Sequence, residues 1–138
     1  MSKVREVMTR NIFCASPFTP ITEAAQEMRK SEIGVVCICH NGKFRGLITE
    51  REMSVAVGAN VNKLKNQRVG SLLNKHHPKI SPGDEIMQAA KVMLRNAVQE
   101  LPVVQNGKLF GLLKFDDIAR QSPGVVAMLS TKLLTVGH

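Results

Sequence analysis

The sequence predicts an α/β (α+β) fold in which two β-α-β-β-α units pack together with pseudo-twofold symmetry. Three observations support this prediction: an internal repeat, an apolar stripe at helical spacing in each copy, and an Asn-Gly turn in each copy. Repetition weighs most, since half of the chain alone would bury too little apolar surface to fold stably. Residues 4–54 align without gaps with residues 69–119. The twelve identical pairs are Val4/Val69, Ser16/Ser81, Pro17/Pro82, Ile21/Ile86, Ala24/Ala89, Ala25/Ala90, Met28/Met93, Asn41/Asn106, Gly42/Gly107, Lys43/Lys108, Gly46/Gly111 and Leu47/Leu112.

The first copy opens with a short helical turn over residues 4–9 and an extended segment over residues 12–15. Thr19 then offers a hydroxyl as a helix N-cap, and Pro20 suits the first helical position. Apolar residues follow at i, i+3, i+4 and i+7, the spacing of a one-faced helix, and its alanines would let it lie close on a sheet. They are Ile21, Ala24, Ala25 and Met28.

A hairpin and a second helix complete the first copy. Apolar runs over residues 35–39 and 44–48 flank Asn41-Gly42, the strongest short hairpin signal because both residues tolerate positive φ. A helix is expected over residues 50–57. The second copy repeats this order, with strands over 101–104 and 109–113 and a helix over 115–120. In this copy the helix N-cap is expected at Asp84 and the hairpin turn at Asn106-Gly107. The apolar stripe is expected at Ile86, Ala89, Ala90 and Met93.

These elements divide the chain into repeat 1 (1–57), a polar linker (58–68), repeat 2 (69–121) and an apolar tail (122–138). Ser122-Pro123 can start a helix in the tail. Two interpretations of the tail remain open: it packs back on its own domain, or it forms a homodimer contact. Its apolar residues are Val125, Val126, Met128, Leu129, Leu133 and Leu134.

Composition predicts a globular, cytoplasmic chain: 43% of its 138 residues are hydrophobic, and no apolar run approaches a membrane span or signal peptide. The net charge of +8 is concentrated around the linker. This surface is either simply solvated or attracts polyanions. With neither Trp nor Tyr to stack on bases, any nucleic-acid binding should be weak and non-specific. The basic residues are Lys63, Lys65, Arg68, Lys75, His76, His77 and Lys79.

Motif searches favour a protein that is not an enzyme and has no metal site. The sequence lacks a phosphate-binding glycine loop, a metalloprotease His-Glu motif and a nucleophile elbow. Cys37 and Cys39 share a strand face, either as a metal or redox pair or as small apolar side chains, and the absence of a second ligand pair at zinc spacing favours the latter. The His76-His77 doublet is either half a metal site or part of a solvated or phosphate-facing loop.

Paired carboxylates stand at matching ends of the two hairpins, Glu50/Glu52 and Asp116/Asp117. These groups could accept hydrogen bonds from a ligand hydroxyl. Alternatively, they are first-turn acids that are stabilised by the positive end of a helix dipole. Residue type and spacing alone leave both interpretations open and favour the second.

Several motifs, in order and twice at one offset, resemble the cystathionine-β-synthase (CBS) domain. They are Val-x-x-Val-Met-Thr, Ser-Pro before Ile-x-x-Ala-Ala-x-x-Met, Glu-Leu-Pro-Val-Val, Asn-Gly-Lys and Gly-Leu-Ile-Thr-Glu-Arg-Glu. Two such domains in tandem resemble a Bateman module, and the resemblance covers residues 4–120. It implies a regulatory module that senses AMP, ADP, ATP or S-adenosylmethionine, requires no cofactor, forms a homodimer and regulates an unidentified protein. A CBS-type interaction module that has lost its ligand is the alternative.

The resemblance also implies two ligand clefts, each joining the ribose-binding motif of one repeat to the adenine-facing wall of the other. The family's Ser/Thr-x-x-Asp motif corresponds to Thr49–Glu52 and to Lys114–Asp117. Glu52 reaches one methylene further than Asp, and Lys114 either binds phosphate or pairs with Asp117. Since Thr49 keeps the small hydroxyl, we expect the first cleft to bind better. The first cleft comprises Leu47, Thr49, Arg51, Glu52, His76, Pro78, Val98 and Gln99, and the second Asn11, Phe13, Ile33, Gly34, Leu112, Lys114 and Asp117.

Overall fold

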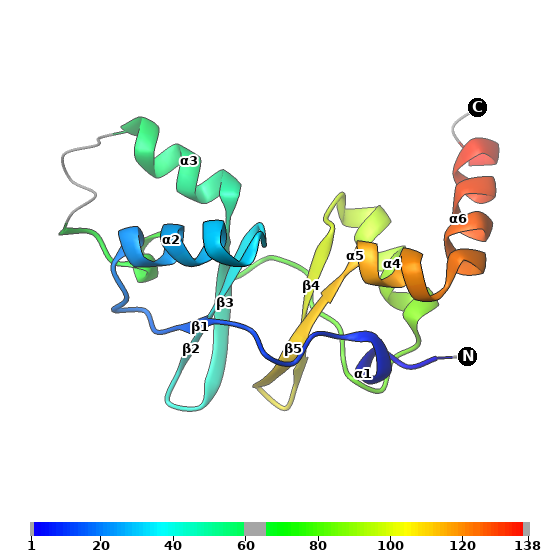
Figure 1. The fold of residues 1–138 in the computed structure, drawn as a ribbon, viewed down its shortest axis with the longest axis horizontal. Helices are drawn as coiled ribbons and strands as arrows, with labels where there is room; N and C mark the ends of the chain where they lie inside the picture. Colours follow the sequence, from blue (N-terminus) through cyan, green and yellow to red (C-terminus); the bar gives the residue numbers. More distant parts are fainter. Residues whose placement is uncertain (1, 60–65, 137–138) are drawn as a thin grey trace. The chain divides into compact units, whose positions relative to one another are not determined.

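The computed structural model describes residues 2–59 and 66–136, so most of the predicted linker lies outside the described residues (Figure 1). The chain divides into two compact units, and neither coincides with one sequence repeat. Unit 1 comprises Met1–Ile12, Pro78–Asn106 and Phe110–His138, and unit 2 comprises Phe13–His77 and Gly107–Leu109. The start of each repeat therefore belongs to the unit that holds most of the other repeat.

Unit 2 contains a three-stranded sheet in the order β1-β2-β3, with β1 parallel and β3 antiparallel to β2. Helices α2 and α3 lie beside the β2–β3 hairpin (Figure 1). The apolar stripe of α2 enters a core that also contains Val36, Ile38, Ile48 and Val69. The elements are β1 (Cys14–Ala15), α2 (Ile21–Ser31), β2 (Val35–His40), β3 (Lys43–Thr49), α3 (Glu50–Ala59) and the 3-10 helix η2 (Val69–Leu72).

Unit 1 repeats this plan with a two-stranded sheet, β4-β5. The counterpart of β1 is reduced to one parallel bridge between Ile80 and Val103. The stripe of α4 lies in a core with Val4, Leu101 and Leu113. The elements are α1 (Val4–Val7), α4 (Ile86–Asn96), β4 (Glu100–Gln105), β5 (Lys108–Lys114), α5 (Phe115–Gln121) and α6 (Pro123–Val136).

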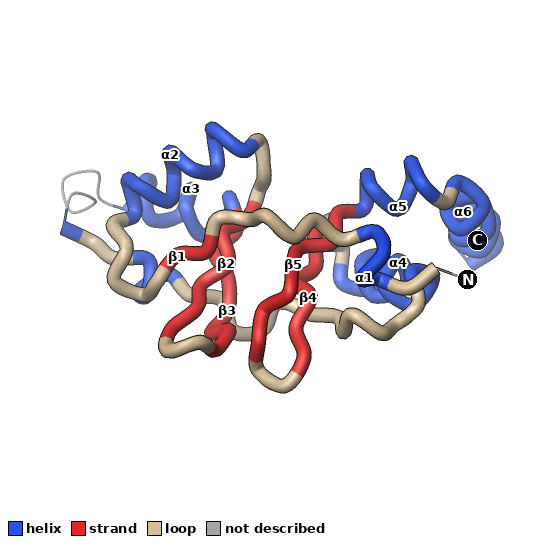
Figure 2. The backbone as a smooth tube through the Cα atoms, turned by 60° about the horizontal axis from the view of Figure 1, so that its bottom comes forward, coloured by secondary structure: helices blue, strands red, loops and turns tan. Residues whose placement is uncertain are grey.

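The α/β class is confirmed, and both predicted hairpins form (Figure 2). Asn41 and Asn106 have φ of 52° and 53°, and the glycines after them have φ of 73° and 78°, as a type I′ turn requires. Ala24, Ala89 and Ala90 are fully buried, whereas Ala25 is only half-buried. Short local signals therefore predicted both the turns and the buried helix faces.

The predicted N-caps Thr19 and Asp84 are wrong. The caps are Pro20 and Glu85, and neither makes a side-chain capping hydrogen bond. Thr19 Oγ1 instead accepts a hydrogen bond from the Ser16 N–H at 3.1 Å, and Asp84 Oδ2 accepts one from the Ser81 N–H at 3.0 Å. Each side chain closes the Ser-Pro turn before its helix, since short polar side chains also satisfy turn backbone.

The two repeats exchange their first residues at matching positions. In unit 1 the Val4 N–H donates to the carbonyl of Asp84 at 2.8 Å, and in unit 2 the Val69 N–H donates to the carbonyl of Thr19 at 2.9 Å. Val4 and Val69 are both fully buried in the unit that receives them. Each core therefore needs an apolar residue from the start of the other repeat.

A second exchanged contact joins each incoming segment to a strand. In unit 1, Thr9 and Leu112 donate backbone hydrogen bonds to each other, both at 2.9 Å. In unit 2, Leu47 and Asn74 do the same at 3.2 and 2.9 Å. The segment that follows Asn74 is thereby held beside the end of β3, where the first paired carboxylates lie.

The tail forms α6, as its Ser-Pro start predicts, and packs back on unit 1 along one face. Val125 and Leu129, one turn apart, are 8% and 6% exposed in the unit 1 core, whereas Met128 is 54% exposed. The side chains of Leu133 and Leu134 lie outside the described residues. Among the described helices, none combines the length and apolar character needed to cross a membrane.

Candidate functional site

Glu52 anchors the start of α3. Thr49 ends β3, and its N–H donates to Glu52 Oε2 at 3.1 Å, while its hydroxyl donates to the same oxygen. A glutamate that reaches back to the N–H three residues before it forms the returning half of a capping box. The Thr-x-x-Glu motif therefore caps the start of α3. Glu50 and Glu52 also both lie in the first turn of this helix, where the dipole interpretation expects them.

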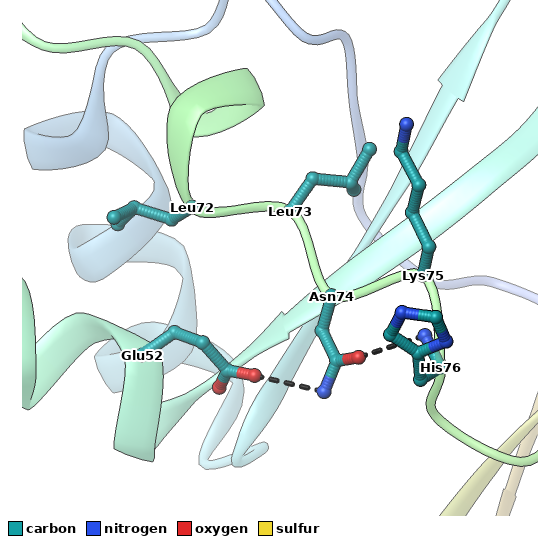
Figure 3. A pocket seen from close by; sticks show the side chains of 6 residues that line it. All are labelled: Glu52, Leu72, Leu73, Asn74, Lys75 and His76. Atoms are coloured by element: carbon teal, nitrogen blue, oxygen red, sulfur yellow. Dashed lines mark hydrogen bonds between the residues drawn. The ribbon is translucent and has the colours of Figure 1, made fainter.

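Asn74 connects Glu52 to the segment that enters from the second repeat. Its Nδ2 donates to Glu52 Oε1 at 2.9 Å, and its Oδ1 accepts from the His76 N–H at 2.9 Å (Figure 3). The second bond forms an Asx turn that fixes the backbone leading to His76. One chain of hydrogen bonds thus joins α3 to the loop that carries His76.

Sequence reasoning missed Asn74. Its spacing to His76 could have indicated an Asx turn, but its bond to Glu52 spans 22 positions and depends on tertiary pairing. Its equivalent in the first repeat is Thr9, so the repeat comparison did not single it out either.

A pocket of about 320 Å³ lies beside this hydrogen-bond chain (Figure 3). Its size falls at the lower end of the range for small-molecule sites. It combines a carboxylate, an amide, two leucines and two basic residues, so it offers acceptors, an apolar wall and positive charge together. The lining residues are Glu52, Leu72, Leu73, Asn74, Lys75 and His76.

The hydrogen bonds to Glu52 also set its ionisation. Partial burial of the carboxyl opposes ionisation, but the bonds from the Thr49 hydroxyl, the Asn74 amide and the backbone outweigh that effect and lower the pKa of Glu52 below its ordinary value of 4.5. Glu52 is therefore an anion at neutral pH, and it attracts cations and hydroxyl donors.

The lowered pKa of Glu52 predicts a pH-dependent contribution to stability. A folded-state pKa below the unfolded one gives stability that is complete above the unfolded pKa and is lost as the pH falls through the folded pKa. We therefore expect wild type to exceed Glu52→Gln in unfolding free energy at about pH 6, and the gap to narrow towards about pH 3. Urea titrations across this range measure it, with the exposed Glu50→Gln as the matched control. A difference in unfolding free energy between wild type and Glu52→Gln that stays constant with pH would contradict the lowered pKa of Glu52.

The equivalent acid of the second repeat has different partners. Lys114 Nζ lies 4.0 Å from Asp117 Oδ2, and Arg120 Nη2 donates to Asp117 Oδ1 at 3.2 Å. Within the described part of the chain, no hydrogen bond reaches the buried Oδ2. Lys114 therefore pairs with Asp117, one of the two roles that the sequence allowed for it.

The predicted clefts draw on residues from both units, and their assembly across the units stays a prediction. Leu47 and Leu112 are 0% and 1% exposed, so both side chains are buried. Glu52 and His76, predicted for the first cleft, line one pocket inside unit 2. By unit, the predicted residues are Leu47, Thr49, Arg51, Glu52, His76, Phe13, Ile33 and Gly34 in unit 2, and Pro78, Val98, Gln99, Asn11, Leu112, Lys114 and Asp117 in unit 1.

The structure describes part of the basic surface that was predicted around the linker. Lys63 and Lys65 lie outside the described residues, whereas Arg68, Lys75 and Lys79 are exposed. Across residues 2–59 and 66–136, no three His, Cys, Asp or Glu side chains gather closely enough to hold a metal ion.

Comparison with known proteins identifies the class of protein. Residues 4–58 and 69–124 each match the CBS domain, so the chain belongs to the CBS-domain family and carries two copies.

Among curated proteins, a 17.7 kDa protein from the bps2 3′ region of Acidianus ambivalens is 31% identical over 121 residues, which are 86% of this chain and 72% of that protein. Hypoxic response protein 1 of Mycobacterium tuberculosis is 28% identical over 127 residues, covering 89% of this chain and 87% of that protein.

Solved structures show the same fold. A crystal structure of Hypoxic Response Protein I with two coordinated zinc ions matches with a TM-score of 0.78 at 26% identity, over 88% of this chain and 100% of that one. The CBS domain pair of protein MJ0100, in complex with 5′-methylthioadenosine and S-adenosyl-L-methionine, matches with a TM-score of 0.77 at 21% identity, over 90% of this chain and 98% of that one.

Proposed function

We propose that this protein is a non-catalytic regulatory module that binds an adenosine-type ligand, namely AMP, ADP, ATP or S-adenosylmethionine. The observation that carries the proposal is the pocket in which Glu52 and His76, assigned to one ligand cleft by resemblance alone, lie together beside Asn74. The MJ0100 pair, solved with two adenosine compounds, supports this ligand class.

The pocket suggests a role for each lining group. Glu52 Oε1 accepts one hydrogen bond, from Asn74, and can accept a second from a ribose hydroxyl. The exposed Lys75 provides positive charge for a phosphate, and the exposed His76 provides a ring N–H donor. Leu72 and Leu73 offer apolar contact to the ligand.

The same contacts provide a route to regulation. Glu52 holds the start of α3 through Thr49 and holds the His76 loop through Asn74. A ligand hydroxyl that bonds to Glu52 Oε1 shares this oxygen with the Asn74 amide, so binding changes how firmly the His76 loop is held against α3. We propose that this change is what a regulated partner protein detects.

A thermal-shift screen on nucleotide-free protein tests the proposal. A ligand at about a hundred times its Kd stabilises the fold by about 2.7 kcal/mol, which raises Tm by roughly 10 °C for a chain of this size. We expect such a rise with AMP, ADP, ATP or S-adenosylmethionine, and a smaller one with GMP, which keeps the ribose phosphate and changes the base. No shift with any adenosine compound would instead favour the interaction module.

We also propose that the protein is a homodimer, as the family resemblance implies, with α6 as the contact. Met128 is exposed on the helix whose opposite face is buried through Val125 and Leu129. Light scattering at micromolar concentration should give twice the chain mass of 15.2 kDa, and Met128→Glu should lower it towards one chain. A single-chain mass for wild type at every concentration would rule the dimer out.

A further inference from the structure

Two cysteines that lie 25 positions apart meet in unit 2. Cys14 Sγ donates a hydrogen bond to Cys39 Sγ, with the sulfur atoms 3.1 Å apart. Strand register alone places Cys14 opposite Cys37, but the β2–β3 pairing shifts between Ile38 and Cys39. The spacing along the strand suggested only Cys37 and Cys39 as a pair, and nothing in the sequence connected either residue to Cys14.

The three thiols differ in access. Cys14 is exposed and Cys39 is half-buried, whereas Cys37 is only 2% exposed. Burial raises the pKa of the Cys37 thiol. Partial burial of its sulfur, with the hydrogen bond to Cys39 and the charge of Cys39, raises the pKa of Cys14 to about 12. Cys14 therefore keeps its proton at neutral pH and acts as the donor of the pair.

We propose that Cys14 and Cys39 form an oxidisable pair that a hydroperoxide closes to an intrachain disulfide. A disulfide joins sulfur atoms about 2.05 Å apart, so the two sulfurs need to approach by about 1 Å. The sulfur atoms already lie in hydrogen-bond contact, and neither cysteine is fully buried, so a small oxidant can reach the pair. The proposal rests on this geometry and is independent of nucleotide binding.

The reaction balances in two steps. The Cys39 sulfur attacks the terminal oxygen of the hydroperoxide, breaks the O–O bond and becomes a sulfenic acid, and the thiol proton passes to the alkoxide, which leaves as an alcohol. Cys14 then attacks the sulfenic sulfur, forming the S–S bond while its proton and the hydroxide leave as water. In total, two thiols and one hydroperoxide give one disulfide, one alcohol and one water.

The disulfide would fasten β1 to β2 and thereby fix the strand that begins unit 2. A cross-link between these positions removes conformational freedom mainly from the unfolded chain. For a loop of this length we expect Tm to rise by about 10 °C on oxidation and to return on reduction.

The test treats the reduced protein with one equivalent of tert-butyl hydroperoxide, alkylates remaining thiols in denaturant and analyses the chain by mass spectrometry. We expect one alkylated thiol, Cys37, and a cross-linked peptide pair that contains Cys14 and Cys39. Cys14→Ser should abolish the cross-link and the rise in Tm, whereas Cys37→Ala should keep both. Cys14 is exposed, so its substitution leaves the fold intact.

Three outcomes would overturn the proposal: three thiols that stay free after oxidant treatment, a disulfide that includes Cys37 or a second chain, and sulfinic acid at Cys39 without a cross-link. A Cys39→Ser variant adds an independent check, because it too should show no cross-link to Cys14.

Discussion

We expect a chain that lacks residues 1–12 to lose the fold of unit 1, although the deletion removes nothing from the second repeat. Val4, Val7 and Met8 are 0%, 7% and 8% exposed, and all three lie in the core that contains the α4 stripe. Full burial of one such side chain contributes about 2 kcal/mol, so losing three costs about 6 kcal/mol. Domains of this size have a total stability of roughly 5–15 kcal/mol.

Hydrogen exchange followed by mass spectrometry measures this loss segment by segment. Amides of β4 and β5 should lose protection in the deleted chain, because they belong to the core that the deletion opens. The control changes exposed positions of the same segment, with Arg5→Ala and Glu6→Ala expected to leave protection unchanged. Protection in β4 that survives the deletion would show that the second repeat folds without the first twelve residues.

The second large effect is expected for Gly46→Ala and Gly111→Ala. An added Cβ at Gly46 would lie 2.6 Å from the Asn74 carbonyl oxygen, and one at Gly111 would lie 2.5 Å from the Thr9 carbonyl oxygen. These atoms belong to the backbone of the exchanged segments, so neither can move without breaking the paired hydrogen bonds. Overpacking of this kind costs about 3 kcal/mol, and Gly46, with φ of +145°, carries additional backbone strain.

Urea unfolding measures both variants. We expect both variants to unfold at a lower urea concentration with an unchanged dependence of the unfolding free energy on urea. Gly46→Ala should lose more unfolding free energy than Gly111→Ala. Gly58→Ala is the control, since nothing lies within 4 Å of its added Cβ. If the variants unfolded within 0.5 kcal/mol of that control, the close approach of the two segments would be wrong.

The sequence predicted what depends on neighbours along the chain. The stripe ending in Met28, the turn at Asn41-Gly42 and their copies in the second repeat are local patterns, and the structure contains them all. The repeat alignment showed that positions 46 and 111 are both glycine, but it did not show why a side chain would be unfavourable there. Each glycine faces a carbonyl from the start of the other repeat, and only the tertiary pairing shows this.

The exchange of the first residues is not visible in the sequence for the same reason. Val4 and Val69 are identical and apolar, which predicts burial without saying in which core. The predicted N-caps Thr19 and Asp84 were wrong for a more local reason. Thr19 can cap a helix or close the preceding turn, and these alternatives differ by less energy than residue preferences resolve.

Glu52 in the candidate site combines a contact that the sequence could predict with one that it could not. The pattern Thr49-x-x-Glu52 was in the sequence, and it fits both a capping box and the family's ribose motif. The structure contains the capping bonds. It also places Glu52 against Asn74 in the lining of a pocket, a contact that no spacing along the chain could predict.

Calorimetric titration of AMP, ADP, ATP and S-adenosylmethionine into nucleotide-free protein tests the central claim most directly, with Glu52→Gln compared against Glu50→Gln. Both variants lose one negative charge in the first turn of α3, but only Glu52 lines the pocket. We predict binding by wild type and Glu50→Gln with the same Kd, and binding at least tenfold weaker by Glu52→Gln, which corresponds to about 1.4 kcal/mol. Equal affinities for the two variants, or no heat with any of the four compounds, would contradict the assignment of an adenosine ligand to the Glu52 pocket.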